Sequence, residues 1–79
     1  MIRRLLIVNR GEIALRIVRA ARELGLVSIV AHSDADVDTL AVHQADEAVC
    51  IGPAQAAKSY LNIPAVIEAA RNCQADAVH

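Results

Sequence analysis

The chain has 79 residues, of which 56% are hydrophobic and one is aromatic, and its formal net charge is −1. This length allows one small domain with little core to spare, and the high hydrophobic content argues against a disordered chain. Near-neutral charge without aromatic stacking platforms argues against nucleic-acid binding. Neither a membrane-spanning stretch nor a cleavable leader is visible, so we expect a soluble, cytoplasmic protein without a membrane partner.

The first strand-to-helix junction indicates the fold class. Leu5–Val8 is a short, wholly apolar run, which is typical of a strand buried on both faces of a parallel sheet. After the polar turn Asn9–Glu12 the apolar residues adopt a helical period. The predicted core-facing stripe of this helix is Ile13, Ile17, Ala20, Ala21 and Leu24. Gly25 is expected to end the helix.

Two further strands are predicted before residue 53. Ser28–His32 is the second short apolar run, and Glu47–Ile51 is the third, closed by Gly52 and Pro53. Thr39–Gln44 between them has room for one or two helical turns. The two cysteines show no metal or disulfide spacing, so Cys50 and Cys73 are both expected to be buried, reduced thiols.

A last helix and the opening of a fourth strand complete the pattern. Asn62 is a candidate N-cap with Pro64 in the first turn. The predicted apolar face of this helix is Ile63, Val66, Ile67, Ala70 and Cys73. Ala75–His79 then reads as a strand. Alternating strands and helices predict a Rossmann-like α/β fold, a parallel sheet with helices on both faces that is incomplete at its C-terminus.

Ligands of such sheets gather beyond the carboxyl ends of the strands. The first of these ends, Asn9–Glu12, could offer the N-terminus of a helix to a nucleotide phosphate, with Asp34 as the ribose-binding acid. The dinucleotide fingerprint needs several glycines, whereas this turn has only Gly11, between Arg10 and Glu12. A structural turn is therefore the favoured interpretation.

Other site patterns are weaker. Asp34, Asp36 and Asp38 alternate like the start of a calcium loop, but the glycine and the terminal glutamate of such a loop are missing, which favours solvated caps. The histidines, His32, His43 and His79, lack metal-ligand spacing. No context for a hydrolase nucleophile surrounds Ser33 or Ser59.

One helical stripe stands out on the surface of the first helix. It consists of Glu12, Arg16, Arg19 and Glu23, and Leu15 is predicted to lie exposed among its arginines. The stripe is either a solvated face with weak ion pairs or a surface for a protein partner, because arginine is enriched at interfaces.

Four blocks in fixed order resemble the N-terminal domain of biotin carboxylase. They are Asn9–Ala14, Ser33–Asp36, Ala45–Pro53 and Lys58–Pro64. The resemblance covers the whole chain, and the last block is most similar to the biotin carboxylase subunit of bacterial acetyl-CoA carboxylase. It implies that residues 1–79 are one partial domain of an ATP-grasp enzyme, without the ATP-grasp and C-terminal domains.

The resemblance also implies a function. The family is an ATP-dependent ligase that uses Mg-ATP and bicarbonate to carboxylate biotin on a carrier protein, upstream of a carboxyltransferase in fatty-acid synthesis. The family's catalytic, cofactor-binding and metal-binding groups lie beyond residue 79, so none is carried over and this chain alone is expected to be inactive. Only His79 reaches the start of a family loop. Family dimers form partly through the first helix, where Arg16, Arg19 and Glu23 match.

Two alternatives remain open at this point. The chain could be a stand-alone Rossmann-like domain that binds a nucleotide at its switch point. It could also be a structural module whose basic helix docks a protein partner.

Overall fold

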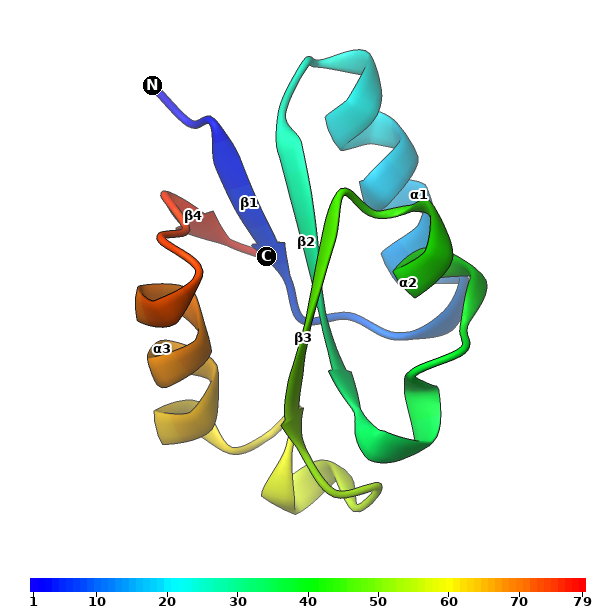
Figure 1. Ribbon diagram of the computed structural model, residues 1–79, viewed down its shortest axis with the longest axis vertical. Helices are drawn as coiled ribbons and strands as arrows, with labels where there is room; N and C mark the ends of the chain where they lie inside the picture. The colour runs from blue at the N-terminus through cyan, green and yellow to red at the C-terminus, as the bar shows by residue number, and fades with distance from the viewer.

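A parallel sheet lies between two helical layers in the computed structural model, which describes residues 1–79 (Figure 1). The strands are β1 (Arg4–Ile7), β2 (Val27–Ser33), β3 (Glu47–Gly52) and β4 (Ala77–Val78). The helices are α1 (Gly11–Glu23), α2 (Leu40–Gln44) and α3 (Ile63–Asn72), with short 3-10 turns η1 (Asp34–Asp36) and η2 (Ala56–Lys58). Each predicted element is present, with ends shifted by one or two residues. No helix is both long and apolar enough to cross a membrane.

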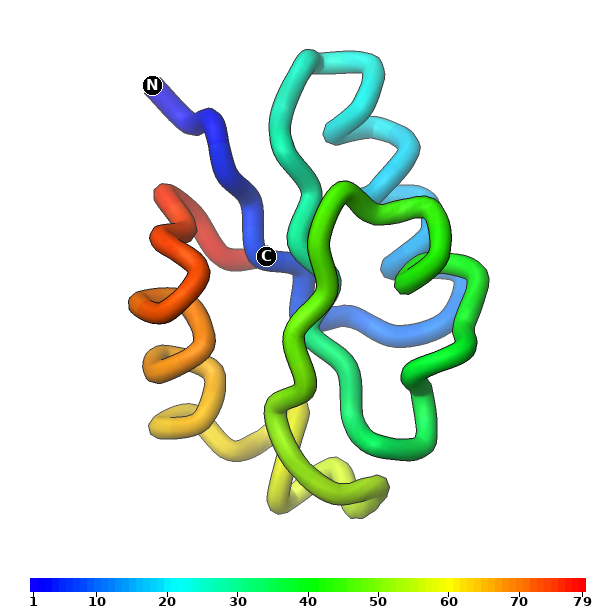
Figure 2. The backbone as a smooth tube through the Cα atoms, viewed as in Figure 1, coloured from blue at the N-terminus to red at the C-terminus, as the bar shows by residue number.

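The strand order is β3-β2-β1-β4, and every neighbouring pair is parallel. The chain moves from β1 outward to β3 and then returns to pair β4 with the free side of β1. The two end segments of the chain therefore lie side by side, as the tube in Figure 2 shows. The predicted parallel α/β fold is confirmed.

Alternate residues of the strands belong to two separate hydrophobic cores, one on each face of the sheet. Ile7 and Val30 face α1 and α2, whereas Leu6, Ile29 and Ala31 face α3. Because side chains of a strand alternate between the two faces, continuous apolar runs are required where both faces are covered. This explains the apolar runs Leu5–Ile7 within β1 and Ile29–Ala31 within β2.

Helix α1 packs through a stripe that overlaps the predicted one only in part, at Ala21 and the partly buried Ile17. Its buried residues are Ala14, Leu15, Val18 and Ala21. Ile13 is 60% exposed and Leu24 is 74% exposed, so their assignment to the core was wrong, and so was the exposed position predicted for Leu15, which is 7% exposed. The helix is apolar on two sides, and only contact with the sheet selects the buried side.

The helix ends follow their sequence signals. At the end of α1, Gly25 has φ +73° and donates its N–H to Arg22, while Leu26 donates to Ala21, which is a Schellman arrangement. At the start of α3, the Asn62 side chain accepts a hydrogen bond of 3.2 Å from the N–H of Ala65. The predicted helix stop and N-cap are both confirmed.

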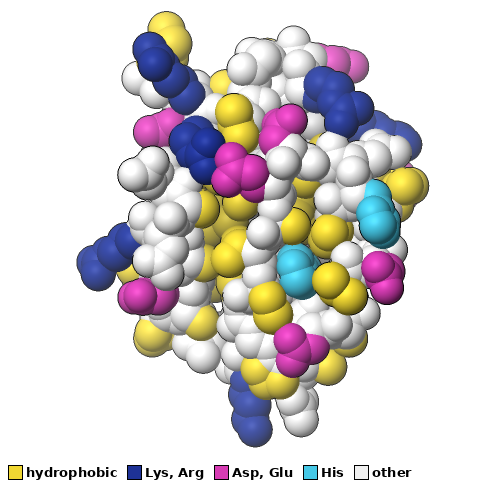
Figure 3. Space-filling model, viewed as in Figure 1, with side chains coloured by type: hydrophobic (Ala, Val, Ile, Leu, Met, Phe, Trp, Pro, Cys, Tyr) yellow, Lys and Arg dark blue, Asp and Glu magenta, His cyan; other side chains and the backbone are white.

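Two predictions of burial near β3 and α3 were wrong. Ile63 and Ile67 of α3 are 69% and 47% exposed, because the helix meets the sheet through Ala69 with Val66 and its neighbours. Cys50 is exposed rather than buried. It lies on the edge strand β3, on the opposite face from the residues that pack under α3. Figure 3 views the molecule from the side of this edge and shows hydrophobic side chains reaching the surface there.

Candidate functional site at the carboxyl edge of the sheet

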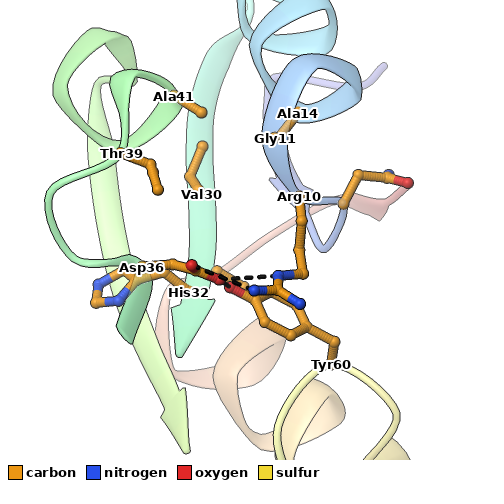
Figure 4. A pocket seen from close by; sticks show the side chains of 11 residues that line it. Arg10, Gly11, Ala14, Val30, His32, Asp36, Thr39, Ala41 and Tyr60 are labelled. Atoms are coloured by element: carbon orange, nitrogen blue, oxygen red, sulfur yellow. Dashed lines mark hydrogen bonds and ion pairs between the residues drawn. The ribbon is translucent and has the colours of Figure 1, made fainter. Parts of the chain in front are cut away.

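Three loops meet beyond the carboxyl ends of β1 and β2. Arg10 follows β1, Asp36 belongs to η1 after β2, and Tyr60 lies between η2 and α3. Figure 4 shows the three side chains pointing toward one another from these separate elements. The parallel direction of the strands brings these side chains together, because the carboxyl ends of all the strands lie at the same edge of the sheet.

The carboxylate of Asp36 is the centre of this cluster. It accepts hydrogen bonds from Arg10 Nε at 2.9 Å and Arg10 Nη2 at 3.3 Å, and from the Tyr60 hydroxyl at 2.5 Å. The Ser33 hydroxyl donates to it at 3.3 Å. The Tyr60 hydroxyl in turn accepts the backbone N–H of Ser33 at 2.9 Å, and the Arg10 guanidinium lies 5.0 Å from the Tyr60 ring centre.

These contacts fix the charge states of the cluster. Hydrogen bonds from Arg10 and then Tyr60 hold the pKa of Asp36 below its ordinary value, and Asp36 raises the pKa of Arg10. Burial, and then the bond to Asp36, raises the pKa of the Tyr60 phenol. The carboxylate and guanidinium are therefore ionised and the phenol is protonated at neutral pH. None of the three is poised to exchange a proton there.

The hollow beside this cluster is small. It is bounded by the cluster, by Gly11 and Ala14 of α1, and by Thr39 and Ala41 at the start of α2, and its volume is about 10 Å³. That volume accommodates about one water. The side chains of Arg10, Asp36 and Tyr60 line this hollow, which lies where α/β sheets usually hold a ligand.

Asp36 corrects one prediction of the sequence. It was expected to be a solvated cap, but its side chain is only 18% exposed and is bonded across three loops. The available signal was the pairing of an arginine after one strand with an aspartate after its neighbour, together with the chain's one aromatic residue. Sequence spacing alone did not show that Tyr60 returns to the same edge.

The remaining candidate residues are dispersed. Asp34 accepts a contact of 3.1 Å from the Cys50 thiol and Asp38 is 91% exposed, so the alternating aspartates do not converge on one point. Asn9 donates to the carbonyl oxygen of His79 at 3.0 Å. Ser59 is fully buried and donates to the carbonyl oxygen of Gln55.

The charged stripe of α1 is exposed and lies apart from the cluster. Arg16, Arg19 and Glu23 all face solvent, and Arg16 makes a loose ion pair of 3.5 Å with Glu12. Leu15 does not join this surface, because it is buried against the sheet. The exposed apolar side chains beside the stripe are instead Ile13 and Leu24.

Comparison with known proteins gives one consistent match. The family described as "Biotin carboxylase, N-terminal domain" matches residues 1–79. The chain is 58% identical to biotin carboxylase of Haemophilus influenzae over 79 residues, which cover 100% of this chain and 18% of that protein. It is 49% identical over 76 residues to the mitochondrial propionyl-CoA carboxylase alpha chain of Sus scrofa, covering 96% of this chain and 10% of that protein.

A solved structure agrees with the sequence matches. The crystal structure of a biotin carboxylase-beta-gamma-ATP complex from Campylobacter jejuni superimposes with a TM-score of 0.93 at 50% identity, covering 99% of this chain and 18% of that one. The chain thus spans less than a fifth of the biotin carboxylases it matches. The resemblance drawn from the four sequence blocks is confirmed. The chain belongs to the biotin carboxylase N-terminal domain family.

Proposed function

We propose that this chain serves as the N-terminal scaffold of an ATP-dependent biotin carboxylase, which uses bicarbonate and Mg-ATP to carboxylate biotin on a carrier protein. The observation that carries the proposal is the family match over all of residues 1–79. Phosphoryl transfer from ATP activates bicarbonate, which is otherwise a poor electrophile, and proteins catalyse such steps mainly by positioning charges. In this proposal the positioning groups belong to other domains.

The carboxyl edge does not fit the cofactors that the family implies. The Arg10 guanidinium, which is the group that could hold a phosphate there, is already paired with Asp36. No three acidic, histidine or cysteine side chains gather as a group that could bind Mg²⁺. In this proposal residues 1–79 carry out no step on ATP, magnesium or biotin.

The relatives favour one enzyme class within the family. Identity is 58% to a bacterial biotin carboxylase and 49% to a propionyl-CoA carboxylase chain. This difference supports the biotin carboxylase subunit of a bacterial acetyl-CoA carboxylase, with the biotin carboxyl carrier protein and a carboxyltransferase as partners in fatty-acid synthesis.

A chimera tests the scaffold role. The first 79 residues of the Haemophilus influenzae enzyme are replaced by this chain, and bicarbonate-dependent ATP turnover with biotin is measured. We expect turnover within about tenfold of the parent, because loss of scaffold contacts worth about 1.4 kcal/mol corresponds to that factor. A well-folded chimera without turnover would contradict the proposal.

The isolated chain tests the alternative of a stand-alone nucleotide-binding module. We expect no bicarbonate-dependent ATPase activity above a blank, and no micromolar heat signal when ATP or NAD is titrated by calorimetry. Saturable micromolar binding would favour the alternative, since this edge would then open to a ligand.

We also propose that the exposed face of α1 contributes to a homodimer through Arg16, Arg19 and Glu23. The helix carries both arginines and glutamates on this face, with Ile13 and Leu24 exposed beside them. A second copy packed antiparallel would therefore set opposite charges and apolar groups against each other.

Charge reversal tests this surface. Arg19→Glu is expected to weaken self-association in sedimentation velocity, whereas Arg71→Glu on exposed α3 is the matched control and should leave it unchanged. A solvated face would tolerate both substitutions equally. Monomers at every concentration would contradict a dimer formed by this chain.

A further inference from the structure

The segment between β3 and α3 crosses the carboxyl edge of the sheet. We refer to residues 53–61 as the strap. It contains η2 and carries Tyr60 into the cluster with Arg10 and Asp36 (Figure 4). The strap is mostly exposed, but Ser59 within it is completely buried. The strap therefore lies against the sheet at defined points rather than along its whole length.

The hydrogen bonds within the strap are mainly local. Lys58 donates its N–H to Gln55, and both Ser59 and Leu61 donate to Ala56. The bonds that join the strap to the strand ends all use the Tyr60 hydroxyl, which accepts from the Ser33 N–H and donates to Asp36. The Tyr60 hydroxyl oxygen therefore makes both hydrogen bonds that attach the strap to the strand ends.

The position of Ser33 explains why this attachment is needed. Strand β1 pairs with β2 only as far as Ile7 opposite Val30, and the register to β3 shifts between His32 and Ser33. Ser33 therefore lies beyond the last β2 residue that pairs with β1, and it is fully buried. A buried N–H without a partner costs about 1–3 kcal/mol, and Tyr60 supplies that partner.

We propose that Tyr60 is a clasp, which holds the strap closed over the crevice at the carboxyl ends of β1 and β2. Releasing the clasp opens the strap locally while the sheet stays folded. The proposal concerns this chain's own conformation and holds whether or not the chimera described above is active.

The single lysine of the chain gives a direct readout. A lysine-specific endoprotease cuts only after Lys58, and that peptide bond leads into the buried Ser59. Cleavage therefore requires the strap to open. When the strap closes fast compared with cleavage, the cleavage rate is proportional to the fraction of molecules whose strap is open. We expect Tyr60→Phe to speed cleavage roughly tenfold or more, the effect of losing a hydrogen bond to a charged acceptor.

Two further variants and one parallel measurement complete the test. Asp36→Ala should also speed cleavage, whereas Glu12→Gln, which breaks only the exposed ion pair with Arg16, should not. Hydrogen exchange should accelerate at the Ser33 amide and stay slow at Ile29. An unchanged cleavage rate in both Tyr60→Phe and Asp36→Ala would overturn the clasp. Hydrogen exchange accelerated equally at Ile29 and Ser33 would also overturn it, because the opening would then involve the whole molecule.

Discussion

Among the three glycines, Gly52 is the one with no room for a side chain. Its φ is +148°, and an added Cβ would collide with the Lys58 carbonyl oxygen where the strap turns back. We expect Gly52→Ala to lower the free energy of unfolding by about 2 kcal/mol or more, from backbone strain and steric overlap together. Gly25→Ala is the control: its φ is +73° with open space around it, so about 1 kcal/mol is expected. Urea denaturation compares them, and equal losses would refute the steric argument.

Among the elements, α1 shows most clearly that hydrophobic periodicity predicts a helix but does not decide which side of it is buried. Its apolar residues follow a helical period, but the stripe through Ile13 and Leu24 and the stripe through Leu15 and Val18 are both apolar. The predicted core residues Ile13 and Leu24 are exposed. We expect Leu15→Ala to cost about 2–4 kcal/mol, because Leu15 is 7% exposed and leaves a cavity. Ile13→Ala should change stability by about 0.5 kcal/mol or less, since Ile13 is 60% exposed. Thermal unfolding of both variants measures this, and the reverse order would restore the predicted stripe.

At the scale of the whole molecule, two carboxylates join distant parts of the chain. Asp76 accepts the backbone N–H groups of Arg3 and Arg4 at 3.0 and 2.9 Å, which fastens the last strand to the first, and Asp36 joins the loops of the carboxyl edge. The backbone bonds from Arg4 and Arg3 hold the pKa of Asp76 below its ordinary value, as Arg10 and Tyr60 do for Asp36.

The sign of the resulting pH dependence follows from these lowered values. A carboxyl whose pKa is lower in the folded chain adds stability above its unfolded pKa of about 3.9, and that stability is lost as pH falls through the folded value. Urea denaturation should therefore show stability falling below about pH 4, with a shallower fall in Asp36→Asn and in Asp76→Asn. Asp38→Asn, at a side chain 91% exposed, is the control. An unchanged acid slope in both variants would contradict these roles.

The sequence by itself determined the elements, their parallel α/β class and the family. Those features depend on local signals, namely apolar runs, the glycine after α1, the Asn62 cap and four ordered blocks of residues. Only the tertiary structure decided which side of α1 is buried, that Cys50 lies exposed on an edge strand, and that Arg10, Asp36 and Tyr60 meet. Such contacts join residues far apart in the chain, and they depend on strand order and on the path of the strap, which no local pattern of side chains encodes.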